Sequence, residues 1–410
     1  MRRRLELITK AATVKRRLTG CLRRVDRAVG RALGRRRVLF DLRNTMNVAV
    51  LQPMFSALQG DDRVHVAFAC EEPGRVAAAV RQEAAAGVLD HAEVAWQRWD
   101  LYVSADPWTR PRLRRCSQSA SFFHGVAGNS NLDDPSALQT GFDWFDRVGF
   151  INAERMDTYV KRGIVSDTAA VLVGFPKADR LAVGGFRACD IKRRLGLDAG
   201  RPTALYAPGW SPAGSLHMAG DQIVASLRDS GFNVIVKLHP MSFHPAEKYT
   251  GGIDWRSRMD AVQEAGRVVH VIESDSSPVM AASDVLVTDH STVGFEYCLL
   301  DRPIVVFDVP DQIRIARVNP EQAARLRSAA CLVGRSEDVG PVARAELARP
   351  ERLSAARRQL AARMFHEPGT ATMRAVAMLY ELLQLAPPPI QPHHAANLAP
   401  QGRGEYSLIG

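Results

Sequence analysis

The sequence has 410 residues, of which 46% are hydrophobic and 24% charged, a composition typical of a globular protein with two domains. Its net charge of +10 comes from residues 1–37, which hold 14 Lys or Arg and 2 acidic residues, whereas the remaining residues hold 40 and 42. A basic body that binds nucleic acid is therefore not expected. No apolar run reaches the roughly 18 residues of a membrane-spanning helix, and six scattered cysteines without a CxxC pair favour a reducing cytoplasm over a disulfide framework or a zinc site.

Residues 1–34 are predicted to form a basic amphipathic leader. Apolar residues recur in it at helical spacing, with most of the arginines off that stripe: Leu18, Leu22, Val25, Val29 and Leu33. Such a helix can lie on an anionic membrane surface, so residues 1–37 predict a peripheral protein at the inner face of the cell membrane. A solvated arm is the alternative. The segment lacks the apolar core of a secretory signal and the serines of a transit peptide.

After the leader, short apolar runs alternate with segments of helical pattern, which predicts an α/β fold with parallel sheets. Eleven runs read as strands: residues 37–42, 63–69, 100–105, 119–124, 146–152, 169–174, 203–208, 233–239, 267–273, 284–289 and 303–309. The polar, glycine-containing stretch 177–202 separates two series of strands. We therefore expect two doubly wound Rossmann-like domains, over 35–180 and 181–385, that face a central cleft, followed by a disordered tail over 386–410.

A phosphate-binding site is predicted where the strand 284–289 ends and a helix begins. Ser291 and Thr292 open that helix after Asp289, and Glu296 lies one turn further on, placed to accept from ribose hydroxyls. Free backbone N–H groups at a helix start, together with hydroxyls, bind anions. Ordinary helix capping by Asp289 and Ser291 is the alternative.

Two further strand ends carry polar or turn-forming residues. Lys237 and His239 end the strand 233–239 and suit a diphosphate, although a structural lysine and histidine would look the same. Pro208 and Gly209 form a loop that could bring backbone N–H groups close to a ligand. The chain has no dinucleotide fingerprint, no P-loop and no paired acidic residues at a strand end, so neither a cofactor nor a metal is predicted.

The run SFFHGVAGNSN places His124 and Gly125 at the end of an apolar segment. A core histidine satisfied by a backbone carbonyl is one interpretation. A general base at the end of a strand is the other.

Together these segments resemble the CDP-glycerol glycerophosphotransferase family of teichoic-acid-type primases and polymerases. The resemblance rests on HG at 124–125, GFPKAD at 174–179, YAPGW at 206–210, KLHP at 237–240 and SDVLVTDHSTVGFE at 283–296. It implies a GT-B-like fold and metal-independent transfer of glycerol phosphate from CDP-glycerol to a lipid-linked or polymeric hydroxyl, with release of CMP.

The resemblance also implies roles for individual residues. His124 would be the base on the acceptor hydroxyl, with Gly125 and Asn129 on the acceptor side. His239 would hold the donor diphosphate, together with Lys237 and the helix start at Ser291 and Thr292.

The chain departs from the family pattern after His124, at YAPGWSP and at TDHST, which leaves glycerol, ribitol or a sugar open as the transferred group. A sugar-nucleotide glycosyltransferase or a UDP-GlcNAc 2-epimerase-like enzyme is the first alternative. A non-catalytic protein that binds a nucleotide or a polyanion is the second.

Overall fold

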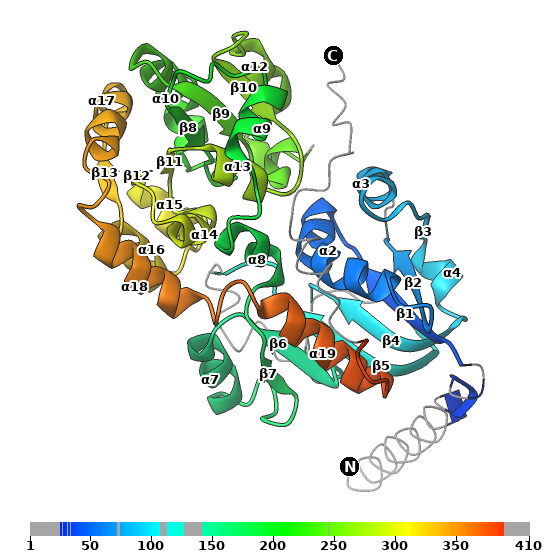
Figure 1. The fold of residues 1–410 in the computed structure, drawn as a ribbon. Helices are drawn as coiled ribbons and strands as arrows, with labels where there is room; N and C mark the ends of the chain where they lie inside the picture. Colours follow the sequence, from blue (N-terminus) through cyan, green and yellow to red (C-terminus); the bar gives the residue numbers. More distant parts are fainter. Residues whose placement is uncertain are drawn as a thin grey trace, which may run out of the picture.

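The computed structural model describes residues 25–26, 28–30, 32, 34–71, 74–106, 113–126, 142–244 and 246–388. Within them the chain forms two parallel β-sheets, each covered by helices (Figure 1). The predicted tail beyond 388, most of the leader and Asn129 lie outside the described residues.

The first sheet has seven parallel strands in the order β3-β2-β1-β4-β5-β6-β7. They are β1 (Arg36–Asp41), β2 (Val64–Ala69), β3 (Val88–Leu89), β4 (Arg98–Ser104), β5 (Arg115–Phe122), β6 (Arg147–Phe150) and β7 (Ala170–Leu172). Its helices are α2 (Thr45–Gln59), α3 (Gly74–Ala84), α4 (His91–Val94), α7 (Ala153–Lys161) and α8 (Pro176–Ala182). The direction of strand order reverses between β1 and β4, so the loops after these strands flank the crevice where such sheets bind ligands.

The second sheet has six parallel strands in the order β10-β9-β8-β11-β12-β13, which reverses between β8 and β11. They are β8 (Thr203–Tyr206), β9 (Asn233–Lys237), β10 (Val268–Val271), β11 (Val285–Thr288), β12 (Ile304–Phe307) and β13 (Cys331–Val333). The intervening helices are α9 (Ala188–Arg194), α10 (Ser215–Asp229), η1 (Pro240–Phe243), α11 (Glu247–Thr250), α12 (Trp255–Ala261), α13 (Ser277–Ala282), α14 (Val293–Tyr297), η2 (Cys298–Leu300), α15 (Pro310–Ile315), α16 (Pro320–Ser328) and α17 (Ser336–Leu347).

Each of the eleven predicted strands overlaps an observed one, but several end before the predicted residue. His124 and His239 lie in the loops just beyond β5 and β9, not within the strands. Two short strands, β3 and β13, were not predicted because two or three residues carry no periodic signal.

The end of the chain returns to the first sheet. Helix α18 (Ser354–Met364) is followed by α19 (Ala371–Leu383), which packs on α2, α8, β4 and β5, as Figure 1 shows. The Tyr380 hydroxyl donates to Asp61 at 2.8 Å, and the Arg36 Nε donates to the Leu383 carbonyl at 3.2 Å. Helix α19, which was predicted to belong to the second domain, thus packs on the first sheet.

The described end of the leader is fastened to the beginning of the first sheet's strands. Asp26 is buried, and its Oδ1 accepts from the Arg115 Nη2 at 2.6 Å. The Arg98 Nη1 donates to the Asp26 carbonyl at 3.2 Å. Val25 and Val29, which belong to the predicted apolar stripe, are exposed. No described helix is long and apolar enough to cross a bilayer.

Candidate functional site

The two loops at the reversal point of the second sheet are tied together by Asp289, which follows β11. Its Oδ1 accepts from the Gly209 N–H at 2.8 Å, and its Oδ2 accepts from the Ser215 N–H at 3.1 Å and the Ser215 hydroxyl at 3.0 Å. Asp289 is fully buried. Both carboxylate oxygens therefore position the loop after β8 and the start of α10.

Gly209 has no room for a side chain. A Cβ there would lie 2.7 Å from the Gln312 Nε2 and 3.1 Å from the Asp289 Oδ1. This close packing accounts for the glycine in YAPGW. Pro208 precedes it and is also buried, so the loop backbone is fixed at the edge of the sheet.

Ser291 and Thr292 lie half-buried at the beginning of α14. Neither hydroxyl caps the helix, and neither makes a hydrogen bond to any described residue. The simple capping explanation therefore does not account for these two hydroxyls, which remain available to an anion.

His239 follows β9 with a defined ring tautomer. Its Nδ1 accepts from the Met241 N–H at 3.1 Å, so in the neutral ring the proton is on Nε2. Burial, with the nearby charges of Lys237 and His124, lowers the pKa of His239 to about 3. The ring is therefore a neutral Nε2–H donor near pH 7.

Lys237 lies at the end of β9, buried, with its Nζ 3.0 Å from the Leu238 carbonyl. Burial and the nearby ammonium of Lys177 lower the pKa of Lys237 to about 8, although Glu273 and Asp275 oppose this. The side chain still carries most of its charge at pH 7.

Glu296 pairs with a lysine that the sequence analysis did not assign to the site. The Lys177 Nζ on α8 is 2.5 Å from the Glu296 Oε2 and 3.9 Å from the Asp275 Oδ1. Burial alone would lower the pKa of Lys177, but the two carboxylates raise it. Glu296 thus has one oxygen engaged by protein, and the pair links the two halves of the chain. The motif GFPKAD at 174–179 includes Lys177, but nothing in the sequence shows that Lys177 pairs with Glu296.

His124 follows β5 and is held by the loop after β4. Its Nδ1 is 3.0 Å from the Ala105 carbonyl, which can only accept. Nδ1 therefore carries the proton, and Nε2 of the neutral ring is free to act as a base. His124 can therefore be bonded to a backbone carbonyl and still act as a general base. The carbonyl holds the proton on Nδ1, which leaves Nε2 free to accept one.

The charge of His124 contributes to the lowered pKa of His239, so the two histidines, which follow β5 and β9, lie near each other. His124 presents an acceptor nitrogen, and His239 presents a donor nitrogen. Gly125, beside His124, has its carbonyl bonded to the Arg155 Nη1 at 2.9 Å. This pairing of a base with a neutral donor suits transfer of a phosphoryl group between two bound substrates.

The chain is similar to proteins of teichoic acid synthesis. Residues 152–313 match the family model described as CDP-glycerol:poly(glycerophosphate) glycerophosphotransferase. A curated relative, the teichoic acid glycerol-phosphate primase of Bacillus spizizenii, is 25% identical over 223 residues, which are 53% of this chain and 49% of the relative. The chain thus spans about half the length of that relative.

Solved structures show the same fold. The wall teichoic acid polymerase TagF matches with a TM-score of 0.61 at 14% identity, over 92% of this chain and 97% of the other. MnaA of S. aureus, solved with UDP, matches with a TM-score of 0.54 at 12% identity, over 86% and 98%. These likenesses confirm the predicted GT-B-like architecture of two Rossmann-like domains.

Proposed function

We propose that the chain transfers glycerol phosphate, or a related polyol phosphate, from a CDP-alcohol to a hydroxyl of a lipid-linked or polymeric acceptor. The match of residues 152–313 to the CDP-glycerol glycerophosphotransferase family model supports this proposal. CMP is the second product, and the acceptor belongs to a cell-envelope polymer. The observation that carries this proposal is that hydrogen bonds fix opposite tautomers on two histidines, leaving a free Nε2 on His124 and an Nε2–H on His239.

In this mechanism the donor diphosphate binds between the His239 Nε2–H, the Lys237 ammonium and the hydroxyls of Ser291 and Thr292. Asp289 acts on the donor only through the loop that it positions. The remaining oxygen of Glu296 accepts from a donor hydroxyl. All these residues lie at the carboxyl ends of β9 and β11 or at the start of α14.

The reaction itself is a single displacement at phosphorus. The His124 Nε2 removes the acceptor proton as the oxygen attacks the phosphorus that bears glycerol. The bond from this phosphorus to the bridging oxygen breaks, and the electron pair leaves with CMP. His239 and Lys237 stabilise the negative charge that develops on the leaving group, so positioning and electrostatics supply most of the catalysis. No cofactor takes part in this proposal.

The first test is release of nucleotide from a panel of CDP-glycerol, CDP-ribitol and UDP-GlcNAc with a glycerol-phosphate acceptor. We expect CMP from a CDP-alcohol and no turnover of UDP-GlcNAc. His124→Ala should lower kcat by about 10²–10⁴-fold while CMP still raises the melting temperature, because a general base contributes this much. His65→Ala, at an exposed position on β2, is the matched control.

Consumption of UDP-GlcNAc would favour the sugar-nucleotide alternative. Stabilisation by CMP without any release of CMP would favour a binding protein without catalysis. Full turnover by His124→Ala would show that the base assignment is wrong.

A further inference from the structure

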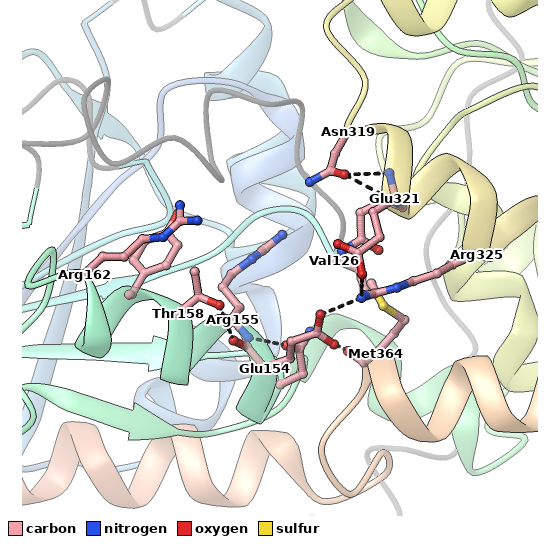
Figure 2. Close-up of a pocket in the computed structure, with 12 residues that line it drawn as sticks. Val126, Glu154, Arg155, Thr158, Arg162, Asn319, Glu321, Arg325 and Met364 are labelled. Atoms are coloured by element: carbon pink, nitrogen blue, oxygen red, sulfur yellow. Dashed lines mark hydrogen bonds and ion pairs between the residues drawn. The ribbon is translucent and has the colours of Figure 1, made fainter.

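A cavity of about 150 Å³ lies beside the loop that carries His124. Figure 2 shows its walls: α7 of the first half on one side, α16 of the second half on the other, and Met364 at the end of α18. Val126, two residues after His124, also lines it. The cavity is therefore next to the proposed base and apart from the donor loops after β8 and β11.

Most charges around this cavity are paired across the two halves. The Glu154 carboxylate on α7 accepts from Arg325 on α16 and from Arg363 on α18, each at 2.7 Å. The bond to Arg363, together with Arg325, lowers the pKa of Glu154 although burial opposes this. Arg325 also pairs with Glu321. Glu154 is thus fully engaged as an anion and does not neutralise any further cation.

Arg155 is the exception. It is only 7% exposed, yet no described carboxylate lies within ion-pair distance of it. Its Nη1 donates to the Gly125 carbonyl, and its guanidinium lies 5.1 Å from the centre of the Phe123 ring. The other guanidinium N–H groups have no hydrogen-bond partner among the described residues. A buried cation without an anion is costly, and an anion bound beside Arg155 would relieve that cost.

Arg325, which also lines the cavity, has one donor without a partner in the described part of the chain. The Nη2 of Arg325 serves both of its carboxylate partners, whereas its Nη1 is buried without a partner among the described residues. Thr158 lies one turn beyond Arg155 on the cavity side of α7. Arg325 already has two carboxylate partners, so the guanidinium that can take phosphate oxygens is that of Arg155.

We propose that this cavity binds the phosphate group of the acceptor, through Arg155. Arg155 is bonded to the residue next to His124, so a phosphate on Arg155 and a hydroxyl at His124 are separated by a short spacer, as in a glycerol-phosphate unit. The site would select acceptors that end in a phosphorylated polyol over neutral polyols. This inference rests on the proposed function for its biological meaning, but its binding test does not.

The test is calorimetric titration with glycerol 3-phosphate, with glycerol and inorganic phosphate as comparisons. We expect wild type to bind both phosphates and not glycerol. Arg155→Gln should weaken binding of glycerol 3-phosphate by about ten- to a hundred-fold, since a hydrogen bond to a charged group is worth this much. Arg155→Lys keeps the positive charge but loses the paired N–H donors of the guanidinium. Its affinity for glycerol 3-phosphate should lie between those of wild type and Arg155→Gln. Lys161→Gln, at the exposed end of the same helix and outside the lining of the cavity, is the control and should keep most of the affinity.

Steady-state kinetics then test the acceptor-phosphate cavity separately from the proposed transferase function. With CDP-glycerol as donor, Arg155→Gln should raise the KM for a glycerol-phosphate acceptor and leave the KM for the donor unchanged. A fall in kcat alone, with unchanged affinity for glycerol 3-phosphate and an unchanged melting temperature, would overturn the proposal and reduce Arg155 to a support for Gly125. If wild type binds glycerol 3-phosphate through Arg155 but releases no CMP, the cavity stands and the proposed function fails.

Discussion

At the scale of single residues, the site depends on which nitrogen of each histidine carries the proton. The Ala105 carbonyl and the Met241 N–H impose opposite tautomers on His124 and His239. Neither constraint is visible in the sequence, because each partner is set by the local path of a loop. The sequence identified both histidines, and only the structure explains how two identical side chains serve as acceptor and donor.

Lys237 gives the site a predictable dependence on pH. Because its pKa is lowered to about 8, its ammonium loses its proton as the pH rises through 8, and the attraction to the donor diphosphate is lost. We expect the KM for CDP-glycerol to rise between pH 7 and pH 9, as measured by initial rates of CMP release.

The Lys237→Met variant should have a high KM throughout this range, without the alkaline rise. His239, with its pKa near 3, should add no acidic limb above pH 5. A wild-type KM that stays constant to pH 9 would contradict the assignment of Lys237 to the donor.

At the scale of elements, the parallel strands were predictable because buried strands of this kind are apolar throughout. Their order and the contacts at their ends were not. Lys177 and Glu296 are 119 positions apart, and Asp289 reaches Gly209 across 80 positions. The sequence assigned Asp289 and Glu296 to the donor, whereas the structure shows that protein donors already occupy both oxygens of the first and one of the second.

The packing of α19 on the first sheet could not be predicted from the sequence either, since the amphipathic pattern of a helix does not show which sheet the helix covers. Leu379 is fully buried in α19, whereas Met373 in the same helix is 55% exposed. We expect Leu379→Ala to lower the free energy of unfolding by 2–5 kcal/mol, measured by urea denaturation.

The matched variant Met373→Ala should change the free energy of unfolding by less than about 0.5 kcal/mol. Equal effects of the two substitutions would show that α19 contributes little to the core. Because α19 packs on β4 and β5, Leu379→Ala should also destabilise the loop that carries His124 more than the loops after β8 and β11.

At the scale of the whole molecule, one hydrophobic cluster runs through both halves, α8 packs on α13, and charged groups pair across the junction as well. Lys177 and Glu296 lie on one side of the junction, and Glu154 with Arg325 and Arg363 on the other. The proposed acceptor cavity lies at this junction, so a bound phosphate would lie between the halves.

The basic leader predicts association with anionic membranes, at the inner face of the cell membrane, where the proposed lipid-linked acceptor would lie. We expect the chain to sediment with vesicles that contain phosphatidylglycerol and not with neutral vesicles. Replacing Arg16, Arg17, Arg23 and Arg24 by Gln should weaken this partition about a thousandfold, at about 1 kcal/mol per charge. The same number of changes at exposed Arg193, Arg194, Arg349 and Arg358 is the control; an equal loss there would mean that net charge alone matters.

The link between Asp26 and Arg115 has a geometric consequence for such a membrane-held enzyme. Arg115 begins β5, and His124 follows its other end. At about 3.3 Å per residue, the eight residues of β5 set the anchor point and the reacting groups roughly 25 Å apart. If the leader binds a bilayer as predicted, this length separates the reacting groups from the point where the leader joins the sheet. For the proposed lipid-linked acceptor, it would set a minimum useful length of the polar chain.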